Sequence, residues 1–243
     1  PMILPDGRSL HGINDASIRI GLRLSKDETI VRMPFEVRHM GSKYPIFSFD
    51  FTGAKRGVLP ASYDYLRLEG RMQYRLNLPP IGYSQLMLEG GKIFGKVPYL
   101  LLKLHEGNGT YFYDRYAFSC MNFYEFSSDA WISFFYEHHF NGFLLGRVPL
   151  LKKLNWREVF VFKGVYGTLS ARNDGSLPNT KAVMLFPVGM SSVEHPYLET
   201  GFGIENIFRL LRVDCIWRLT HHRAVPGLSI PTFTVNFSLN LKF

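Results

Sequence analysis

Two pairs of adjacent histidines, His138-His139 and His221-His222, are the side chains best suited to metal chemistry in this sequence. Glu137 precedes the first pair and could add a carboxylate ligand. Adjacent residues of a strand point to opposite faces of the sheet, so each pair offers at most one ligand to either face. The spacing therefore favours histidines at a surface or a strand rim, and we predict no metal site and no cofactor.

The other reactive residues do not form a catalytic pattern. Cys120 and Cys215 lie far apart, with no Cys or His nearby at the spacing of metal ligands. Gly201 and Gly203 lie in a strand-like segment without a following helix, so they indicate close packing or a bend rather than a phosphate-binding loop. We therefore predict that the protein is not an enzyme, and we identify no small-molecule substrate.

Charged side chains recur at alternate positions in two regions of the chain. Nine of them are candidates for one shared site: Arg67, Glu69, Arg71, Arg75, Glu199, Glu205, Arg212, Asp214 and Arg218. We predict that they form cross-strand ion pairs on one face of a sheet. Either these residues only neutralise one another, or they line a pore or a binding surface with a basic bias.

The elements that carry these charges are strands with two chemically different faces. From Leu66 to Leu78, the even positions are mostly apolar and the odd positions are all charged or amide residues. This alternation predicts a strand about 43 Å long, which spans about 33 Å when it is tilted by about 40°. Such a strand is long enough to cross the hydrocarbon core of a bilayer.

The last residues of the chain repeat this alternation. One face carries Phe233, Val235, Phe237, Leu239, Leu241 and Phe243, and the other face is polar. An amphipathic last strand that ends on an aromatic residue resembles the targeting signal of bacterial outer-membrane barrels, which the barrel-assembly machinery recognises. We expect these six residues to act as such an assembly signal.

Further strand-like segments complete an all-β pattern. They lie at 18–24, 45–52, 82–92, 115–126, 129–140, 157–170, 197–204 and 212–220, with one or two more near 29–37 and 180–188. Only 143–154 suggests a helical turn, which Pro149 keeps short. The pattern predicts one domain, 1–243, that forms an antiparallel transmembrane β-barrel of about 10–12 strands or part of a larger barrel.

Composition limits the other classes of protein. No apolar run reaches the roughly 18 residues of a transmembrane helix, and the mean hydropathy is −0.03. The net charge of +8 comes from Lys and Arg that are spread singly, which argues against nucleic-acid binding. Aromatic residues make up 15% of the chain and cluster at 111–126 and 131–136. These clusters fit the interfacial girdles of a membrane barrel, or alternatively a large aromatic core.

Three segments resemble one known family: Gly41–Phe49, Phe140–Val159 and Thr200–Thr220. They are similar to a Bacteroidota outer-membrane family of unknown function. Its full-length members carry an N-terminal carboxypeptidase-regulatory-like domain and end in a β-barrel. The resemblance implies a Gram-negative outer-membrane barrel with no assigned activity. It also implies that this chain is the C-terminal part of a longer protein.

A second, fainter resemblance concerns Ile204–Leu219, which is similar to the last strands of Omp85-like barrels. Those barrels insert or translocate proteins, and they carry an Arg-Gly-aromatic motif on a loop that folds into the lumen. The nearest candidate in this chain is Arg56-Gly57-Val58, which lacks the aromatic residue. This departure weakens the case for an insertase.

The combined prediction is an integral outer-membrane β-barrel with a charged lumen and a role in transport, envelope assembly or surface structure. The expected partners are outer-membrane lipid and, during biogenesis, the barrel-assembly machinery. Two alternatives stay open: a soluble β-barrel that binds an apolar ligand, and the C-terminal part of a TonB-dependent receptor, although the loops here look short for such a receptor. If Phe243 lies at the periplasmic end, the loops 171–196 and 223–230 face outward, and the connections 141–155 and 205–209 face the periplasm.

Overall fold

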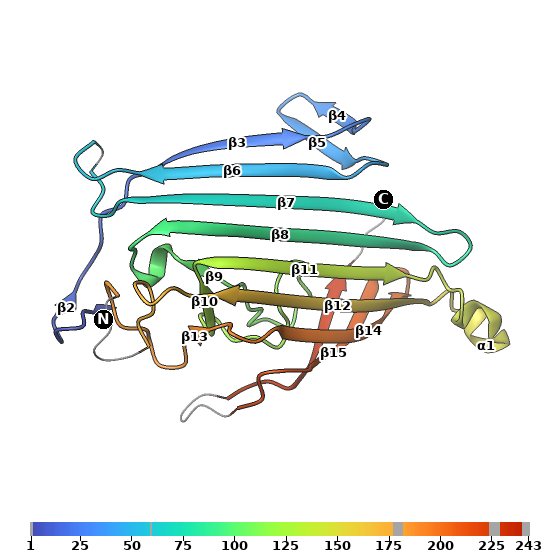
Figure 1. Ribbon diagram of the computed structural model, residues 1–243. Coiled ribbons are helices and arrows are strands. Elements are labelled where there is room, and N and C mark those ends of the chain that lie inside the picture. Colours follow the sequence, from blue (N-terminus) through green and yellow to red (C-terminus); the bar gives the residue numbers. More distant parts are fainter. Residues whose placement is uncertain (1, 59, 177–181, 224–228, 240–243) are drawn as a thin grey trace.

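One curved antiparallel sheet forms the body of the molecule (Figure 1). The computed structural model describes residues 2–58, 60–176, 182–223 and 229–239. The main sheet contains β3 (Ile18–Leu24), β6 (Ile46–Ala54), β7 (Tyr65–Asn77), β8 (Tyr83–Gly95), β11 (Ala130–His139), β12 (Arg157–Thr168), β14 (Tyr197–Ile207), β15 (Leu211–Arg218) and β16 (Phe233–Leu239). The predicted all-β antiparallel fold is therefore confirmed.

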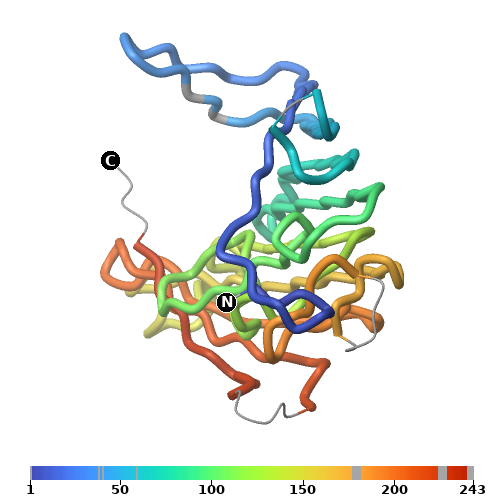
Figure 2. Tube along the Cα trace, turned by 90° about the vertical axis from the view of Figure 1, so that its left-hand side faces the viewer, coloured from blue at the N-terminus to red at the C-terminus, as the bar shows by residue number. Residues whose placement is uncertain are grey.

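The strand order of this sheet is β16-β15-β14-β12-β11-β8-β7-β6-β3, and all neighbouring strands are antiparallel. Seen along the strands, the sheet curves into an open arc (Figure 2). Strands β3 and β16 lie at its two edges, and they do not pair with each other in the described residues. The sheet thus has a concave face and a convex face.

Several short strands, two 3-10 turns and one short helix lie outside the main sheet. They are β1 (Met2–Ile3), β2 (Ser9–Leu10), β4 (Thr29–Met33), β5 (Glu36–Gly41), β9 (Lys103–Leu104), β10 (Phe126–Ser128), β13 (Ser191–Ser192), the 3-10 turns η1 (Tyr99–Leu101) and η2 (Leu145–Arg147), and the helix α1 (Pro149–Lys152). The predicted helical turn within 143–154 is confirmed, and Pro149 begins α1. No helix in the described part of the chain is long and apolar enough to cross a membrane.

Two of the predicted strands are wrong. Residues 115–125 form a loop that is followed by β10. Phe118 of this loop packs against Phe135 of β11, so the loop covers the sheet instead of joining it as a strand. Residues 182–188 contain no strand, and the first part of the segment predicted at 180–188 lies outside the described residues. The segment near 29–37 is a hairpin of two strands, β4 and β5, that projects from one end of the sheet.

The two faces of the sheet differ as the alternation predicts. On β14, for example, Glu199 on the concave face is fully buried, whereas Phe202 on the convex face is 60% exposed. The same alternation continues to the last described strand, where Phe233, Val235, Phe237 and Leu239 share the convex face. Leu241 and Phe243 lie outside the described residues, so the assembly signal stays a prediction.

The predicted aromatic clusters at 111–126 and 131–136 were expected to form either an interfacial girdle or a core, and some of their residues are buried in a core. Phe118, Phe126 and Phe135 are buried together with Tyr197 in one core cluster, and Trp131 belongs to a second. The girdle assignment is wrong for these residues, because they line the concave side of the sheet and its covering loop. These five aromatic residues therefore belong to the core, whereas many other aromatic side chains are exposed.

Candidate functional site

A long connection between two neighbouring strands covers part of the concave face. We call residues 96–129, which join β8 to β11, the inserted segment; it contains η1, β9 and β10. It lies inside the arc of the sheet (Figure 2). The connection 169–196 between β12 and β14 is also long, in agreement with the predicted loop 171–196, whereas the expectation of short loops is wrong for the inserted segment.

Charged side chains of the sheet hold the main chain of the inserted segment. The Lys163 ammonium on β12 donates to the carbonyl oxygens of Asp114 and Ala117, at 2.7 and 2.6 Å. The Glu199 carboxylate on β14 accepts from the backbone N–H groups of Ser119 and Cys120, at 2.8 and 2.6 Å. Because both side chains are buried, these bonds replace the water that each charge would otherwise require.

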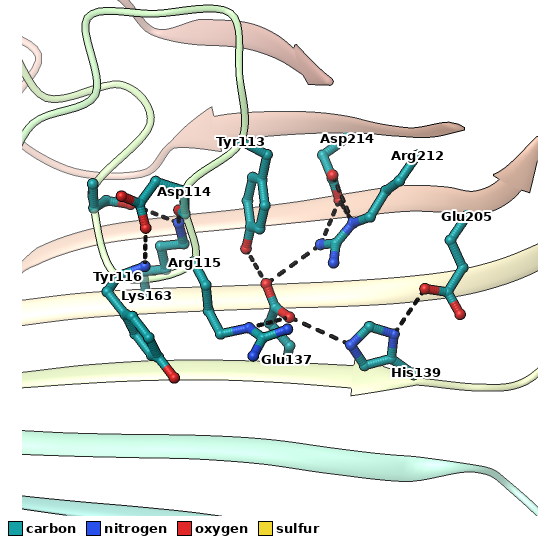
Figure 3. A network of polar contacts seen from close by, with 11 residues as sticks. Tyr113, Asp114, Arg115, Tyr116, Glu137, His139, Lys163, Glu205, Arg212 and Asp214 are labelled. Carbon is teal, nitrogen blue, oxygen red and sulfur yellow. Dashed lines mark hydrogen bonds and ion pairs between the residues drawn. The ribbon is translucent and has the colours of Figure 1, made fainter. Parts of the chain in front are cut away.

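Glu137 on β11 is the centre of a second group of contacts (Figure 3). Its carboxylate accepts from the Tyr113 hydroxyl and from Arg115 Nε at 2.9 Å, both on the inserted segment. Arg212 of β15 approaches the same carboxylate at 3.4 Å and binds Asp214 at 2.7 Å.

The imidazole of His139 extends this group along β11. It lies 3.4 Å from Glu137 and 3.1 Å from Glu205 of β14. We call Tyr113, Arg115, Glu137, His139, Glu205, Arg212 and Asp214 the Glu137 cluster. It joins the inserted segment to three strands of the sheet.

A smaller polar group lies where the inserted segment meets β7 and β8. Glu89 binds Arg71 at 2.6 Å and Lys103 of β9 at 2.7 Å. These three residues line a cavity of about 240 Å³ together with His105 and Tyr116. Beyond this cavity, towards β3, the concave face is more open, and the side chain of Arg71 is half exposed.

The structure places all nine predicted charged residues on the concave side but pairs them differently from the prediction. Arg67 binds Glu69, and Arg212 binds Asp214, each two residues along the same strand. Arg71 forms a cross-strand pair, but its partner is Glu89, which was not among the nine.

The remaining predicted residues bind groups that strand alternation does not indicate. Arg75 stacks on the Tyr83 ring at 4.0 Å, and Arg218 binds Glu125 of the inserted segment at 2.5 Å. Glu205 binds His139, and Glu199 binds backbone amides. The expectation that the nine pair mainly with one another is wrong.

The first histidine pair ends β11 and is buried rather than at the surface, whereas the second pair lies beyond the end of β15. His139 lies in the Glu137 cluster, whereas His138 points to the other face and bonds Ser84 Oγ at 2.8 Å. The His221 ring contacts the carbonyl oxygen of His195 at 2.8 Å. In the described residues, no group of three or more His, Cys, Asp or Glu is arranged to hold a metal ion.

Gly203 allows close packing between β14 and β15, one of the two roles predicted for it from the sequence. A Cβ atom at Gly203 would lie 2.2 Å from Asp214 Oδ1, so this glycine leaves room for the carboxylate that binds Arg212. Arg56-Gly57-Val58, by contrast, lies in the turn between β6 and β7, where Arg56 bonds the carbonyl oxygen of Ser62. The loop over the concave face instead carries Arg115. The search for an Arg-Gly-aromatic motif did not identify this residue, because Tyr116 follows it instead of glycine.

The remaining missed residues share a weak sequence signal. Glu89, Glu137 and Lys163 are single charges at inward positions of largely apolar strands. A lone charge in phase with buried residues indicates a partner from outside the sheet, because a buried charge requires one. Neither the identity of that partner nor the path of the inserted segment follows from this pattern.

Comparison with known proteins gives a family for the chain. The family model described as "Family of unknown function (DUF5686) C-terminal domain" matches residues 11–171. The chain belongs to this family. The matched part of the DUF5686 domain includes the inserted segment, Glu137 and Lys163, whereas β14 to β16 lie beyond it. No curated protein matches the chain.

Replacing Glu137 with Gln should loosen the inserted segment. The change leaves Arg115 and Arg212 without their shared carboxylate, so the free energy of unfolding should fall by about 3 kcal/mol or more. Urea unfolding measures this loss. Glu69→Gln is the matched control, since Glu69 is less deeply buried and its loss should cost under about 1 kcal/mol.

Cys120 supplies an independent readout for the same variant. Burial raises the pKa of its thiol to about 12, so maleimide should modify it very slowly in the native protein. With Cys215→Ser as background, Glu137→Gln should increase the modification rate, and Glu69→Gln should leave it unchanged. Equal rates in both variants would contradict the role of Glu137 in holding the segment.

Acid should destabilise the inserted segment through His105. Burial lowers the pKa of His105 from 6.5 to about 3, and nearby Lys103 acts in the same direction. The unfolded chain therefore binds a proton between these values while the folded chain does not, so stability falls as the pH drops below 6.5. The loss should reach about 1.4 kcal/mol per pH unit. His105→Gln should flatten this slope in urea titrations between pH 6.5 and 5, whereas His11→Gln, at an exposed position, should not.

Proposed function

We propose that this chain forms part of an outer-membrane β-barrel of a Gram-negative bacterium of the Bacteroidota, with the convex face towards lipid and the concave face towards a charged lumen. The observation that carries this proposal is the exposed apolar surface of the convex face. Its exposed members include Ile18, Ile20, Leu22, Leu24, Phe47, Phe49, Phe51, Leu66, Leu76, Phe94, Ile132, Tyr166, Phe202, Trp217, Phe233, Phe237 and Leu239. Water-soluble monomers rarely expose a continuous apolar surface of this extent.

The polar exceptions on the convex face also support a membrane location. Lys92 lies near one end of the strands, and Ser84, His138 and Glu158 lie near the other end. An apolar band with polar residues at its borders matches the outside of a membrane barrel. The nine strands would then be a curved section of the wall, and closure of the barrel would need further strands.

The soluble alternative has less support. A soluble barrel that binds an apolar ligand needs an apolar interior. Here the concave side buries Glu137, Lys163, Glu199 and Arg212, and their hydrogen bonds hold the inserted segment in place. For a role without enzymatic activity, this arrangement favours a barrel whose interior is partly filled by its own loop.

The strand order also defines the two ends of the proposed wall. The connections 55–64, 96–129, 169–196 and 219–232 lie at one end, and the connections 25–45, 78–82, 140–156 and 208–210 lie at the other. If the C-terminal end of β16 faces the periplasm, the two long connections 96–129 and 169–196 face outward, and the connection 25–45 with its hairpin faces the periplasm. This places the inserted segment as a loop that enters the lumen from the outer side.

Envelope assembly is a second candidate role, and one observation favours it over simple transport. The loop that covers the concave face carries Arg115, whose guanidinium binds Glu137 on the neighbouring wall. Omp85-like barrels also carry an arginine on a loop that folds into the lumen. Tyr116, Ala117 and Phe118 follow Arg115 here, so the likeness is in the arrangement more than in the motif.

Membrane extraction tests the proposed function. In its native bacterium, the protein that contains this chain should fractionate with outer membranes and require detergent for extraction. It should also migrate faster on gels before heating than after, because folded barrels resist dodecyl sulfate. Recovery in the soluble periplasmic fraction without detergent would contradict the proposal.

Arg71 allows a test of the charged lumen. Arg71→Glu places a carboxylate next to Glu89 on the more open part of the concave face. In planar bilayers, the reversal potential under a salt gradient should shift towards cation preference. Arg32→Glu, at an exposed position of β4 on the hairpin that projects from the sheet, is the control and should leave the reversal potential unchanged. An unchanged selectivity in Arg71→Glu would exclude a conducting lumen lined by this residue.

A further inference from the structure

The connection between β11 and β12 combines exposed apolar and basic side chains. It contains η2 and α1, and the turn between β14 and β15 lies beside it, since Asn206 Nδ2 donates to the Asn155 carbonyl oxygen at 2.8 Å. The exposed apolar residues of the two turns are Leu144, Val148, Leu150, Leu154, Phe208 and Leu210. Leu150 and Phe208 are the most exposed, at 80% and 83%.

The basic residues are also exposed, and the two turns themselves contain no acidic residue, although the Glu158 carboxylate of β12 contacts the backbone of one of them. Arg147, Lys152, Lys153 and Arg209 are the charged residues of 141–156 and 208–210, so the local charge is +4. Arg147 stacks on the Phe143 ring at 4.0 Å, and no ion pair within the described residues uses these four cations. An anionic ligand would therefore meet charges that are still free.

One hydrogen bond fixes the side of the sheet on which this segment lies. Glu158 points to the convex face, as do Phe160 and Phe162 on the same strand. Its carboxylate accepts from the backbone N–H of Leu145. The start of the connection therefore packs against the convex side, at the border of the exposed apolar surface.

We propose that residues 143–154 and 208–210 form a binding surface for anionic phospholipid headgroups. This inference rests on the proposed function, because it requires the convex face to lie in a membrane. Leu144, Leu150 and Phe208 insert among the acyl chains, and the four cations contact headgroup phosphates just outside. Apolar residues with flanking Lys and Arg are typical of segments that lie in a membrane interface.

The positive charge of the surface favours an anionic phospholipid over a zwitterionic one. A zwitterionic headgroup offers no net charge to four unpaired cations, whereas phosphatidylglycerol supplies one negative charge per molecule. Each Lys or Arg near an anionic membrane surface contributes about 1 kcal/mol. Loss of two such charges should therefore lower the association constant for the anionic lipid by about thirtyfold at low salt.

A fluorescent probe at Leu150 tests the inference. The full chain with Cys215→Ser and Leu150→Cys is labelled with bimane and reconstituted in vesicles that contain brominated phosphatidylglycerol or brominated phosphatidylcholine. Cys120 is buried and should not compete for the label. We expect both lipids to quench the probe, with phosphatidylglycerol effective at several-fold lower mole fraction.

Two controls separate the outcomes. Lys152→Gln with Lys153→Gln leaves Arg147 and Arg209 in place and should weaken the lipid preference, whereas Lys55→Gln with Lys96→Gln removes two exposed charges at the opposite end and should preserve it. A second probe at Ile132→Cys, on the convex face of β11, reports membrane embedding itself.

Each failure has a distinct meaning. If neither lipid quenches the Ile132 probe, the membrane location and hence the proposed function are wrong. If the Ile132 probe is quenched and the Leu150 probe is not, the surface contacts something other than lipid, and the inference is overturned. A preference for phosphatidylglycerol that is as strong in Lys152→Gln with Lys153→Gln as in the unmodified surface also overturns it.

Discussion

The Glu137 carboxylate is the constraint on which the arrangement of the concave face depends. It is almost fully buried, and it contacts Tyr113 and Arg115 of the inserted segment as well as Arg212 of β15. A buried carboxylate costs several kcal/mol unless nearby groups compensate its charge. Here the compensating groups come from opposite sides of the carboxylate. The inserted segment must therefore lie over this part of the sheet for the strands themselves to be stable.

The same requirement explains the difference between the two faces. Charges on the concave side find partners because the inserted segment supplies both ionic side chains and backbone groups. The convex side has no such cover in the described residues, and it carries apolar side chains instead. In a membrane, lipid would cover that face without any demand for hydrogen bonds. A single pattern of alternation thus serves two environments, one polar and internal, the other apolar and external.

Much of the sheet could be predicted from the sequence, because strand alternation is a local property. The alternation of apolar and polar residues predicted the positions of β7, β15 and β16, and it assigned the correct side chains to each face. The inserted segment could not be predicted, because its contacts join residues far apart in the chain. Cys120 and Glu199, for example, are 79 residues apart, and the bond uses a backbone amide that any residue could supply. Its aromatic residues therefore looked like a strand with an interfacial girdle.

Backbone recognition also explains why the pairing of charges was mispredicted. An arginine and a glutamate on neighbouring strands suggest an ion pair when only side chains are considered. Glu199 and Lys163 lie opposite each other on β14 and β12, yet each instead binds main-chain groups of the inserted segment. These hydrogen bonds stabilise the fold more than a direct ion pair between Glu199 and Lys163 would, because the amides and carbonyls of the loop would otherwise be buried without partners. The sheet thereby specifies where the loop lies through its backbone, and the loop's side chains remain available to fill the core and to reach Glu137.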